Sequence, residues 1–397
     1  MTPPRTILAY APGPWGWPDF GGSPRYHLWT LAGMGWPVLY VEPPLKWRWK
    51  RALWSAPDRP FHVLSPARVP PFSARHAPVN ALGEKWRVYT SARLAGEARA
   101  ALATLGLAPT VYWFGAPWHG ALAADAPDGL TRVNFVYDEL VESPALDAPH
   151  RSRLARWESE LRDQCGLVVC SSLPQVERRR DLGHPRVELL ENAVRDDFLA
   201  DSPATPRDPA FAEAVARIRA MPHPRVAYGG VADHRLDPAV FSEVLTMGEV
   251  GSLLFLGKRD PSLDGNLGGR CDQSGKAVFL GQIPYGWYPA LYAECDALLI
   301  AHRRTPFTEA MYPEKLNEYL ASGKPIVSVD LPEVRRVRAE AGWPEAIRVA
   351  GNPAEFAAAL RTALRPEPAE LPAERRRLAA KRTWSQMGER LAGLLDR

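Results

Sequence analysis

Two side chains in the last third of the chain, Lys315 and Glu318, are of the types that can hold a nucleotide. Because they stand three residues apart, they share one face of a helix. A lysine beside a helix N-terminus can meet a diphosphate, and a carboxylate can accept two hydrogen bonds from vicinal ribose hydroxyls. The alternative is a solvated pair worth about 0.3 kcal/mol on an ordinary surface helix, and spacing alone favours it.

The residues around this pair predict a helix that runs into a buried strand. Pro313 suits the first helical turn, where its missing N–H loses nothing, and Gly323 suits the left-handed residue just past the helix end. Leu316, Tyr319 and Leu320 fall together on the face that we expect to be buried.

The rest of the chain alternates short β-branched or aromatic runs with helical stretches. The expected strands of the first half are 6–10, 38–41, 61–64, 111–114, 133–137, 167–170 and 187–190. After a Pro/Asp/Ala-rich segment at 201–209 the pattern restarts, with 226–229, 253–257, 277–280, 297–300 and 326–329. This alternation predicts two doubly wound α/β domains, in which ligands bind beyond the carboxyl ends of the strands.

Length and composition agree with two domains of ordinary size. The 397 residues are 46% hydrophobic and 24% charged, as in a soluble globular protein. No apolar run approaches the roughly 18 residues of a membrane span, and the N-terminus lacks a secretory signal, so we expect a cytoplasmic protein. The net charge of +4 does not indicate a nucleic-acid binder. The four cysteines lack zinc-site spacing and are expected to be reduced and mostly buried.

Residues 313–328, which read Pro-x-Lys-x-x-Glu-Tyr-Leu-Ala-x-Gly-Lys-Pro-Ile-Val-Ser, closely resemble the donor-site segment of GT-B glycosyltransferases, particularly those of family 4. In that family the glutamate equivalent to Glu318 is the second of a Glu-x7-Glu pair and binds the ribose of a nucleotide sugar. The first glutamate would fall on Ala310. Either the neighbouring Glu309 replaces it, or that contact with the sugar is absent.

Other segments resemble the same family, and the resemblance covers most of residues 185–395. Residues 191–194 are similar to the segment that closes the N-terminal domain, and 225–231 to the first strand and loop of the nucleotide-binding domain, which contains Gly230. Arg235 follows where many relatives carry a basic residue that contacts the donor diphosphate. A solvated arginine after a β-turn is an equally good reading of that position.

The resemblance continues through 279–284 and 291–300, which match a strand, a loop, a helix and the next strand. It implies that the backbone around Gln282 and Ile283 lies against the donor base. His302 and Arg303, just past the second strand, would then approach a phosphate or a sugar, although a surface turn explains them about as well. Residues 380–385 precede a terminal helix that is similar to the GT-B tail.

In the N-terminal half, residues 20–27 stand where family 4 enzymes keep a glycine-rich loop near the donor phosphate and the acceptor. Gly21 and Gly22 permit close backbone approach, and Arg25 or His27 could touch the reacting groups. The two glycines could also form a simple turn. Asp138, after another expected strand, could orient an acceptor hydroxyl or cap the next helix.

Eleven of the fourteen tryptophans lie within the first 157 residues. Indole faces stack on sugars and suit membrane interfaces, while core packing accounts for some of them. The segment 46–54, Lys-Trp-Arg-Trp-Lys-Arg-Ala-Leu-Trp, interleaves cations with indoles. This pattern is typical of an interfacial anchor, and we hypothesise peripheral attachment to an anionic membrane.

The resemblance implies an α/β protein of GT-B architecture, with two Rossmann-like doubly wound domains facing each other across a cleft. The expected domains are an acceptor-side domain at 1–200, a nucleotide-sugar-binding domain at 201–378, and a terminal helix at 379–397 that packs back on the first domain. The implied reaction is a retaining, metal-independent transfer of a sugar to a glycan, lipid-linked or small-molecule acceptor, as in cell-surface polysaccharide synthesis.

A retaining mechanism requires no enzymic base, because the leaving phosphate can take the proton. No Asp-x-Asp occurs, which argues against a metal-dependent GT-A transferase. We expect no metal and no resident cofactor, the nucleotide sugar being a substrate. The alternatives are a nucleotide-sugar epimerase of the same fold and a carbohydrate-binding homologue without turnover.

The predicted reaction-centre residues are Arg235, Lys315, Glu318, Asp138 and His27. The predicted donor-binding residues are Gly22, Gly230, Arg235, Gln282, Ile283, His302, Lys315, Leu316 and Glu318.

Overall fold

Two β-sheets, each in its own compact unit, form the framework of the chain. The computed structural model describes residues 5–16, 23–44, 50–67, 81–200, 206–263 and 265–397. Within these, the first unit comprises 5–16, 23–191 and 387–397, and the second comprises 192–386. The chain therefore passes between the units at 191/192 and at 386/387, whereas the sequence-based domain limits are 200 and 378.

In the described residues of the first unit, the sheet has eight strands in the order β3-β4-β2-β1-β5-β6-β7-β8. All neighbours are parallel except β3, which pairs with β4 in antiparallel fashion. Most of these strands are short apolar runs, because helices cover both faces of such a sheet. Their bounds are β1 Ile7–Tyr10, β2 Val38–Val41, β3 Ala52–Ser55, β4 Phe61–Ser65, β5 Val111–Phe114, β6 Thr131–Val136, β7 Leu167–Cys170 and β8 Val187–Leu189.

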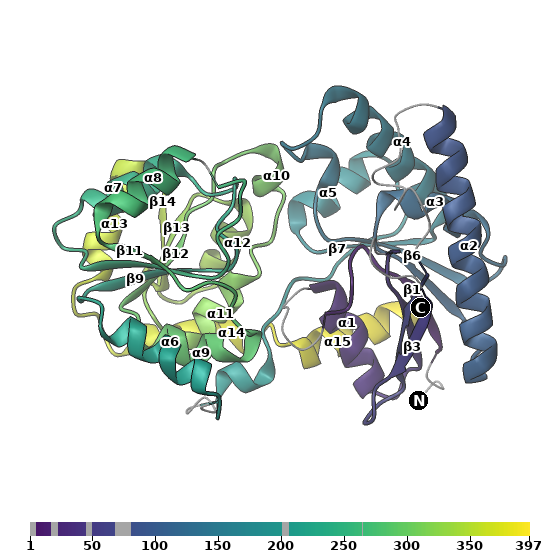
Figure 1. The fold of residues 1–397 in the computed structure, drawn as a ribbon, viewed down its shortest axis with the longest axis horizontal. Coiled ribbons are helices and arrows are strands. Elements are labelled where there is room, and N and C mark those ends of the chain that lie inside the picture. Colours follow the sequence, from purple (N-terminus) through teal and green to yellow (C-terminus); the bar gives the residue numbers. More distant parts are fainter. Residues whose placement is uncertain (1–4, 17–22, 45–49, 68–80, 201–205, 264) are drawn as a thin grey trace. The chain divides into compact units, whose positions relative to one another are not determined.

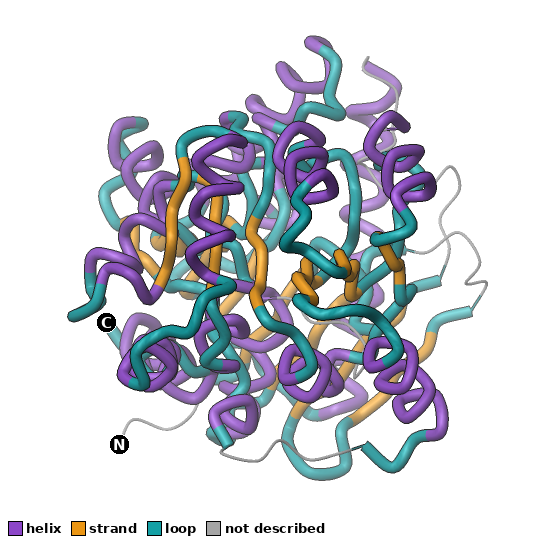
Figure 2. The backbone as a smooth tube through the Cα atoms, turned by 90° about the vertical axis from the view of Figure 1, so that its left-hand side faces the viewer, coloured by secondary structure: helices purple, strands orange, loops and turns teal. Residues whose placement is uncertain are grey.

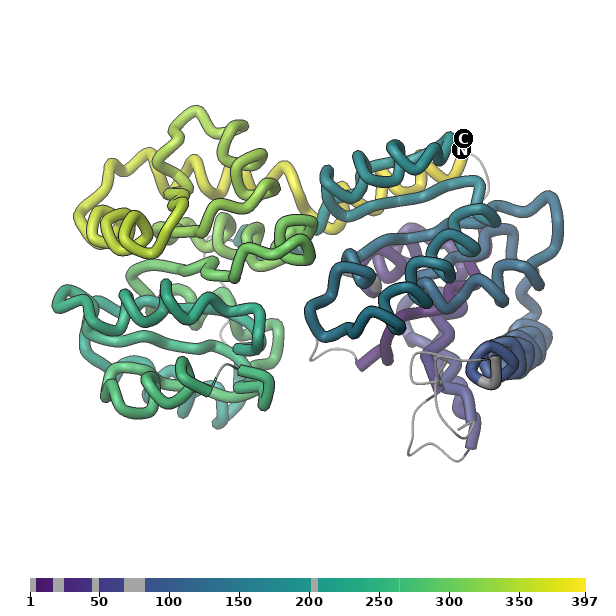
Figure 3. Tube along the Cα trace, turned by 90° about the horizontal axis from the view of Figure 1, so that it is seen from above, coloured from purple at the N-terminus to yellow at the C-terminus, as the bar shows by residue number. Residues whose placement is uncertain are grey.

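The helices of the first unit begin with polar caps where the sequence supplies them. Asp147 accepts a hydrogen bond from the backbone N–H of His150, and Ser172 accepts one from that of Gln175. The long α2, which Figure 3 shows nearly end-on in blue, packs on the core beside β1, β2 and β5. The helices are α1 Ser23–Gly33, α2 Ala81–Leu105, α3 Gly120–Ala124, α4 Ala148–Gln164 and α5 Leu173–Asp181.

Over its described residues, the second unit has a sheet of six parallel strands in the order β11-β10-β9-β12-β13-β14. Numbered within the unit, this order is 3-2-1-4-5-6, that of a doubly wound Rossmann-like sheet, and its switch point lies between β9 and β12. The strands are β9 Arg225–Gly229, β10 Ser252–Leu256, β11 Ala277–Phe279, β12 Ala297–Ile300, β13 Ile326–Val329 and β14 Ile347–Ala350.

Helices cover both faces of this second sheet. Figure 1 shows α7, α8 and α13 along one face and α6, α9, α11 and α14 along the other. Figure 2, coloured by secondary structure, shows the orange strands enclosed by purple helices. The helices are α6 Pro209–Arg219, α7 Pro238–Thr246, α8 Gly265–Ser274, α9 Tyr288–Ala293, α10 Pro306–Glu309, α11 Lys315–Ser322, α12 Pro332–Ala339, α13 Pro353–Ala363 and α14 Glu370–Ala379.

The last helix, α15 (Trp384–Leu395), contributes residues 387–397 to the first unit. A Cβ on Gly388 would lie 2.3 Å from Cγ2 of Thr30 in α1, so a glycine is needed for this approach. Arg186, just before β8, donates a hydrogen bond to the carbonyl of Leu394 at 2.6 Å. In Figure 3, α15 is the yellow helix that lies along the first unit.

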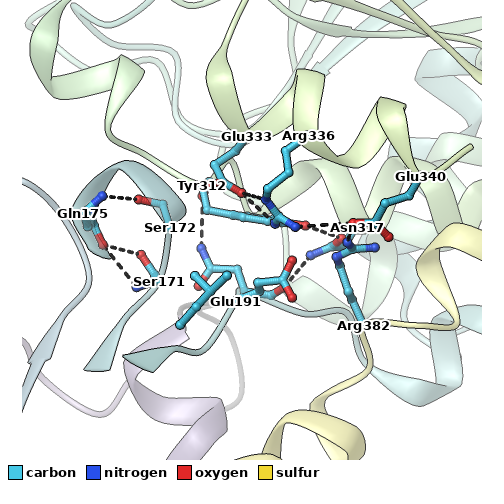
Figure 4. A network of polar contacts seen from close by, with 12 residues as sticks. Ser171, Ser172, Gln175, Glu191, Tyr312, Asn317, Glu333, Arg336, Glu340 and Arg382 are labelled. Carbon is cyan, nitrogen blue, oxygen red and sulfur yellow. Dashed lines mark hydrogen bonds and ion pairs between the residues drawn. The ribbon is translucent and has the colours of Figure 1, made fainter. Parts of the chain in front are cut away.

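Just before α15, an ionic network stabilises the end of the second unit. Arg336 bridges Glu333 and Glu340 at 2.7 and 3.3 Å, and Glu340 also pairs with the buried Arg382 (Figure 4). Residue 194 forms an isolated parallel bridge with residue 383. The two segments at which the chain leaves and re-enters the first unit, around residues 194 and 383, are thereby paired with each other inside the second unit.

Two composition-based expectations can be compared with the structure directly. All four cysteines are buried and free of disulfides, as expected. In the described part of the chain, no helix combines the length and the apolar character that membrane crossing requires.

Candidate functional site

The candidate site is built on α11, whose C-terminal end and buried face follow the sequence prediction, whereas Pro313, predicted in the first turn, precedes the helix. Gly323 has a φ of +72° and ends the helix in the left-handed conformation. Leu316, Tyr319 and Leu320 are fully buried, as predicted. The helix proper begins at Lys315, and the carbonyl of Pro313 accepts a hydrogen bond from the Leu316 N–H at 2.9 Å. Lys315 and Glu318 therefore both stand in the first turn.

Buried Arg375, in α14, holds the C-terminal end of α11. Its guanidinium donates to the carbonyls of Gly323 and Ala346 at 2.9 and 2.8 Å and forms two hydrogen bonds of 2.6 Å with the Glu367 carboxylate. The two bonds to Glu367 run from separate nitrogens to separate oxygens, which is the bidentate geometry in which arginine binds carboxylates most strongly. The far end of α11 is therefore rigidly attached to the body of the unit.

A second group of hydrogen bonds holds the start of α11. Fully buried Asn317 donates to the carbonyl of Asn192 at 2.7 Å and accepts from the Tyr312 hydroxyl at 2.9 Å (Figure 4). The Asn192 side chain in turn donates to the Tyr312 carbonyl at 3.0 Å. The first turn of α11 is thus fixed to the segment that follows β8, and its register cannot slip without breaking these bonds.

Lys315 extends toward the ends of β9 and β12, at the switch point of the sheet. Its ammonium donates to the hydroxyl of Tyr228 at 3.2 Å, lies 3.4 Å from Nε2 of His302, and stands 4.7 Å from the centroid of the Tyr228 ring. The Tyr228 hydroxyl and His302 Nε2 are themselves 3.1 Å apart. Doubly wound sheets bind their ligands at this kind of position.

His302 is fully enclosed beside this ammonium. Its exposed fraction is 0%, and burial, with smaller contributions from the charges of Lys315 and Arg235, holds the pKa of His302 well below its usual value. The imidazole is therefore neutral at physiological pH. A neutral ring can accept a hydrogen bond from the Lys315 ammonium without adding charge to the site.

Glu318 lies one helical turn from Lys315 and has a tyrosine as its partner. The hydroxyl of Tyr292, in α9, donates to Oε2 of Glu318 at 2.9 Å. Burial raises the pKa of Glu318 above its usual value, although hydrogen bonds from Tyr292 and Tyr285 and the charge of Lys315 act in the opposite direction. The carboxylate is thus a nearly enclosed acceptor, held in one orientation.

The end of β9 and the start of the loop after it come very close to these side chains because they contain Gly229 and Gly230. The Gly229 N–H donates to the Tyr319 hydroxyl at 2.7 Å, and a Cβ on Gly229 would overlap the Tyr292 hydroxyl at 2.4 Å. Gly230 has a φ of +103°, and a Cβ there would stand 3.6 Å from Cε of Lys315. The loop therefore presents bare backbone beside the ammonium, as phosphate-binding loops do.

Arg235, predicted to contact a diphosphate, is paired with a neighbour in this structure. Its guanidinium hydrogen-bonds both carboxylate oxygens of Asp233, with the shortest contact at 2.7 Å. Although burial raises the pKa of Asp233, hydrogen bonds and charge from Arg235 outweigh it and hold that pKa below its usual value. The Arg235 carbonyl also accepts from the Arg303 N–H at 2.7 Å, so this loop lies beside the end of β12.

The side chains of the other predicted donor-binding residues differ in their exposure to solvent. Gln282 is exposed, whereas Ile283 is buried in the turn before Tyr285. The Leu316 side chain lies in the core, so only its backbone is available to a ligand. At the position of the missing glutamate, Ala310 directly follows α10, and the neighbouring Glu309 pairs with Arg304 at 3.1 Å.

The predicted residues of the first unit are placed as follows. His27, in α1, is fully buried with its ring centroid 5.0 Å from that of Phe135, and burial lowers its pKa to about 3. Asp138 is exposed just after β6. Gly22 and residues 46–49 lie outside the described residues. The remainder of the aromatic and basic segment includes β3, an exposed edge strand with Trp54 45% exposed.

Sequence reasoning missed three side chains that form hydrogen bonds with predicted site residues and so orient them, namely Tyr228, Tyr292 and Asp233. Tyr228 immediately precedes the glycine pair at the carboxyl end of β9, and that position could have marked it. Asp233 stands two residues before Arg235, a spacing that allows local pairing. Tyr292 reaches Glu318 across 26 positions of sequence, and no local signal predicts that contact.

Both units are Rossmann-like domains with mainly parallel sheets, and together they have the GT-B architecture. Solved structures match this fold over almost the whole chain. A sucrose-phosphate synthase from Thermosynechococcus elongatus has a TM-score of 0.72 at 16% identity, with 98% of each chain covered. An α,α-trehalose-phosphate synthase (UDP-forming) from Burkholderia xenovorans, in complex with glucose-6-phosphate, has a TM-score of 0.72 at 12% identity, with 99% of this chain and 100% of that chain covered.

A further match is an E. coli structure described as trehalose-6-phosphate bound with UDP-2-fluoro glucose. Its TM-score is 0.70 at 13% identity, with 99% of each chain covered. No family model matches the chain, and no curated protein matches it in sequence. At such low identity the solved structures establish the fold, and the likeness to family 4 stays a prediction.

Proposed function

We propose that this chain is a glycosyltransferase that uses a nucleotide-sugar donor. The observation that carries the proposal is the placement of Lys315 and Glu318 in the first turn of α11, beside the Gly229–Gly230 loop at the switch point between β9 and β12. The fold shared with the sucrose-phosphate and trehalose-phosphate synthases supports it, because one of those structures is described with a UDP-sugar analogue bound.

In this proposal the ammonium of Lys315 binds the donor diphosphate and the Glu318 carboxylate accepts hydrogen bonds from the ribose. Charge builds on the diphosphate as the bond to the sugar breaks, so a fixed cation and the bare backbone at Gly230 stabilise the departing group. Arg235 joins them by sharing its guanidinium between Asp233 and the phosphate. We propose that the transfer proceeds without a metal ion. We also propose that it retains the anomeric configuration, with the leaving phosphate taking the proton of the acceptor hydroxyl.

The acceptor is proposed to be a sugar. The Burkholderia xenovorans synthase is described with glucose-6-phosphate, which makes sugar phosphates the first acceptors to test, followed by glycans and lipid-linked sugars of polysaccharide synthesis. Asp138 remains our proposed contact for an acceptor hydroxyl, because it is exposed two residues after the end of β6. His27 is less suited to direct contact, because its ring is fully buried.

Calorimetric titration with UDP, GDP and ADP tests the donor site. We expect at least one of them to bind and Lys315→Met to weaken it at least about tenfold, since the variant loses a charged hydrogen bond. Lys324→Met is the matched control, because Lys324 lies just past the other end of α11 and donates to the Ala293 carbonyl. Equal affinities in wild type and Lys315→Met would contradict the site.

Turnover assays with a panel of nucleotide sugars distinguish the enzyme from its alternatives. Release of nucleoside diphosphate that depends on an added acceptor, and a product that keeps the donor's anomeric configuration, would support a retaining transferase. Conversion of the donor into its epimer without an acceptor would show an epimerase. Binding with neither outcome would indicate a carbohydrate-binding homologue.

We also propose that the chain attaches peripherally to anionic membranes through the segment 46–54. The described end of this segment supports the idea, since Leu53 and Trp54 in edge strand β3 are 37% and 45% exposed next to exposed Lys50 and Arg51. Sedimentation with phosphatidylglycerol vesicles at low salt is the test. We expect binding that Trp54→Ala and Arg51→Glu weaken, and absence of binding by the wild type would refute the proposal.

A further inference from the structure

We infer that Tyr228 and His302 are positioning residues that aim the Lys315 ammonium at the donor diphosphate. This inference rests on the proposed function, because it assigns to Lys315 the task of binding phosphate. The position of His302 just after β12 suggests direct contact with a ligand, whereas the inference gives it a different role. The reasons lie in the direction of the hydrogen bonds and in the burial of the ring.

The direction of the hydrogen bonds follows from the chemistry of the three groups. An ammonium has no acceptor, so the Tyr228 hydroxyl accepts from Lys315 at 3.2 Å and is left with its own hydrogen to donate. Two acceptors face that hydrogen, Nε2 of His302 at 3.1 Å and the Val231 carbonyl at 3.4 Å, and the imidazole nitrogen is the nearer of the two. Nε2 also faces the ammonium at 3.4 Å, so it acts only as an acceptor. The chain of donors thus runs from Lys315 through Tyr228 to His302.

This arrangement holds a flexible side chain in one direction. A lysine carries four rotatable bonds, and free rotation about them would have to be lost when a phosphate binds. Here the ammonium is already held between a hydroxyl, an imidazole nitrogen and the face of the Tyr228 ring at 4.7 Å. Both partners are neutral, so they orient the ammonium without cancelling the charge that a diphosphate would meet.

The burial of His302 argues against direct contact with a ligand. Its exposed fraction is 0%, so a diphosphate could not reach the ring without a rearrangement of the loop or the strand end. Lys315, in contrast, is partly exposed. The lysine is therefore the member of the group that a ligand can touch, and the histidine acts through it.

The second ring nitrogen of His302 indicates that the residue is kept for binding rather than for stability. With Nε2 accepting, the hydrogen lies on Nδ1, which is buried and has no hydrogen-bond partner among the described residues. A buried donor without an acceptor destabilises a fold, and a ring without that N–H would avoid the penalty. In His302→Phe the Tyr228 hydroxyl keeps the Val231 carbonyl as an acceptor at 3.4 Å. The variant should therefore be about as stable as wild type while it binds phosphate more weakly.

Four variants measured by calorimetry with UDP and with inorganic pyrophosphate test the inference. We expect Tyr228→Phe and His302→Phe each to weaken binding by about tenfold, the range of one charge-assisted hydrogen bond. His302→Gln places an amide where Nε2 stands and should restore most of the affinity. His302→Asn places it near Nδ1 and should not. A merely structural role would not distinguish the two amides by position.

A double-mutant cycle with Lys315→Met shows whether His302 acts through the lysine. In the Lys315→Met background, His302→Phe should have no further effect on UDP affinity. An equal loss in both backgrounds, or wild-type affinity in both Tyr228→Phe and His302→Phe, would overturn the inference. Failure of the wild type to bind either UDP or pyrophosphate would instead overturn the proposed function, so the two failures are distinguishable.

Discussion

Replacement of Arg375 by methionine is the most informative test of how α11 is held. The wild-type guanidinium is completely buried and forms four hydrogen bonds, two to the carbonyls of Gly323 and Ala346 and two to Glu367, whose side chain is 15% exposed. Methionine fills a similar volume but donates nothing. The variant therefore leaves a nearly buried carboxylate and two carbonyls without this partner.

The magnitude follows from the loss of one member of a buried ion pair, which costs about 3–5 kcal/mol in free energy of unfolding. For a unit of this size, each kcal/mol lowers the melting temperature by about 2–4 °C, so Arg375→Met should lower it by about 6–20 °C. Because the Gly323 carbonyl marks the end of α11, nucleotide affinity should fall as well. Urea denaturation and calorimetric titration measure the two effects.

Two control variants make this prediction specific. Arg361→Met removes a cation of α13 that is 47% exposed and paired with Glu249, itself 49% exposed, and should cost at most about 1 kcal/mol. Glu367→Gln combined with Arg375→Met removes the unpaired charge and should recover part of the lost stability. A loss below about 1 kcal/mol in Arg375→Met alone would show that the buried pair does not hold α11.

Three further predictions concern the site itself. Gly230→Ala should cost about 1–2 kcal/mol, because alanine resists a φ of +103°, and should weaken nucleotide binding beside Lys315; wild-type values in urea denaturation and titration would contradict this. Asn317→Ala removes its two bonds, including that to Asn192, and should cost about 2–3 kcal/mol, with an unchanged denaturation midpoint as the contrary result. Burial raises the folded-state pKa of Glu318, so the free energy of unfolding of the wild type should increase as the pH falls from neutral through that pKa. Glu318→Gln should be the more stable protein at neutral pH and should show no such increase. Parallel curves of stability against pH for the two proteins would refute the reasoning.

Local sequence signals predicted most of the strands. The bounds of β2, β5, β7, β12 and β13 agree with the predicted ranges, because a short β-branched run between helices has few alternatives to a buried parallel strand. β3 and β14 were missed. β3 is an exposed edge strand whose pattern of cations and indoles indicated a membrane anchor, and β14 contains Arg348 within a four-residue run.

The sequence by itself determined α11, its glycine end, its buried face and the presence of Lys315 and Glu318 in one turn, because these depend on residues within about one helical turn of each other. Only the tertiary structure decided what surrounds those two side chains. Tyr228 is 87 positions from Lys315, and no local pattern encodes their contact. The same is true of Arg375, which reaches the end of α11 across 52 positions. Helix ends are local properties of the backbone, whereas the orientation of a charged side chain depends on the partners that folding brings to it.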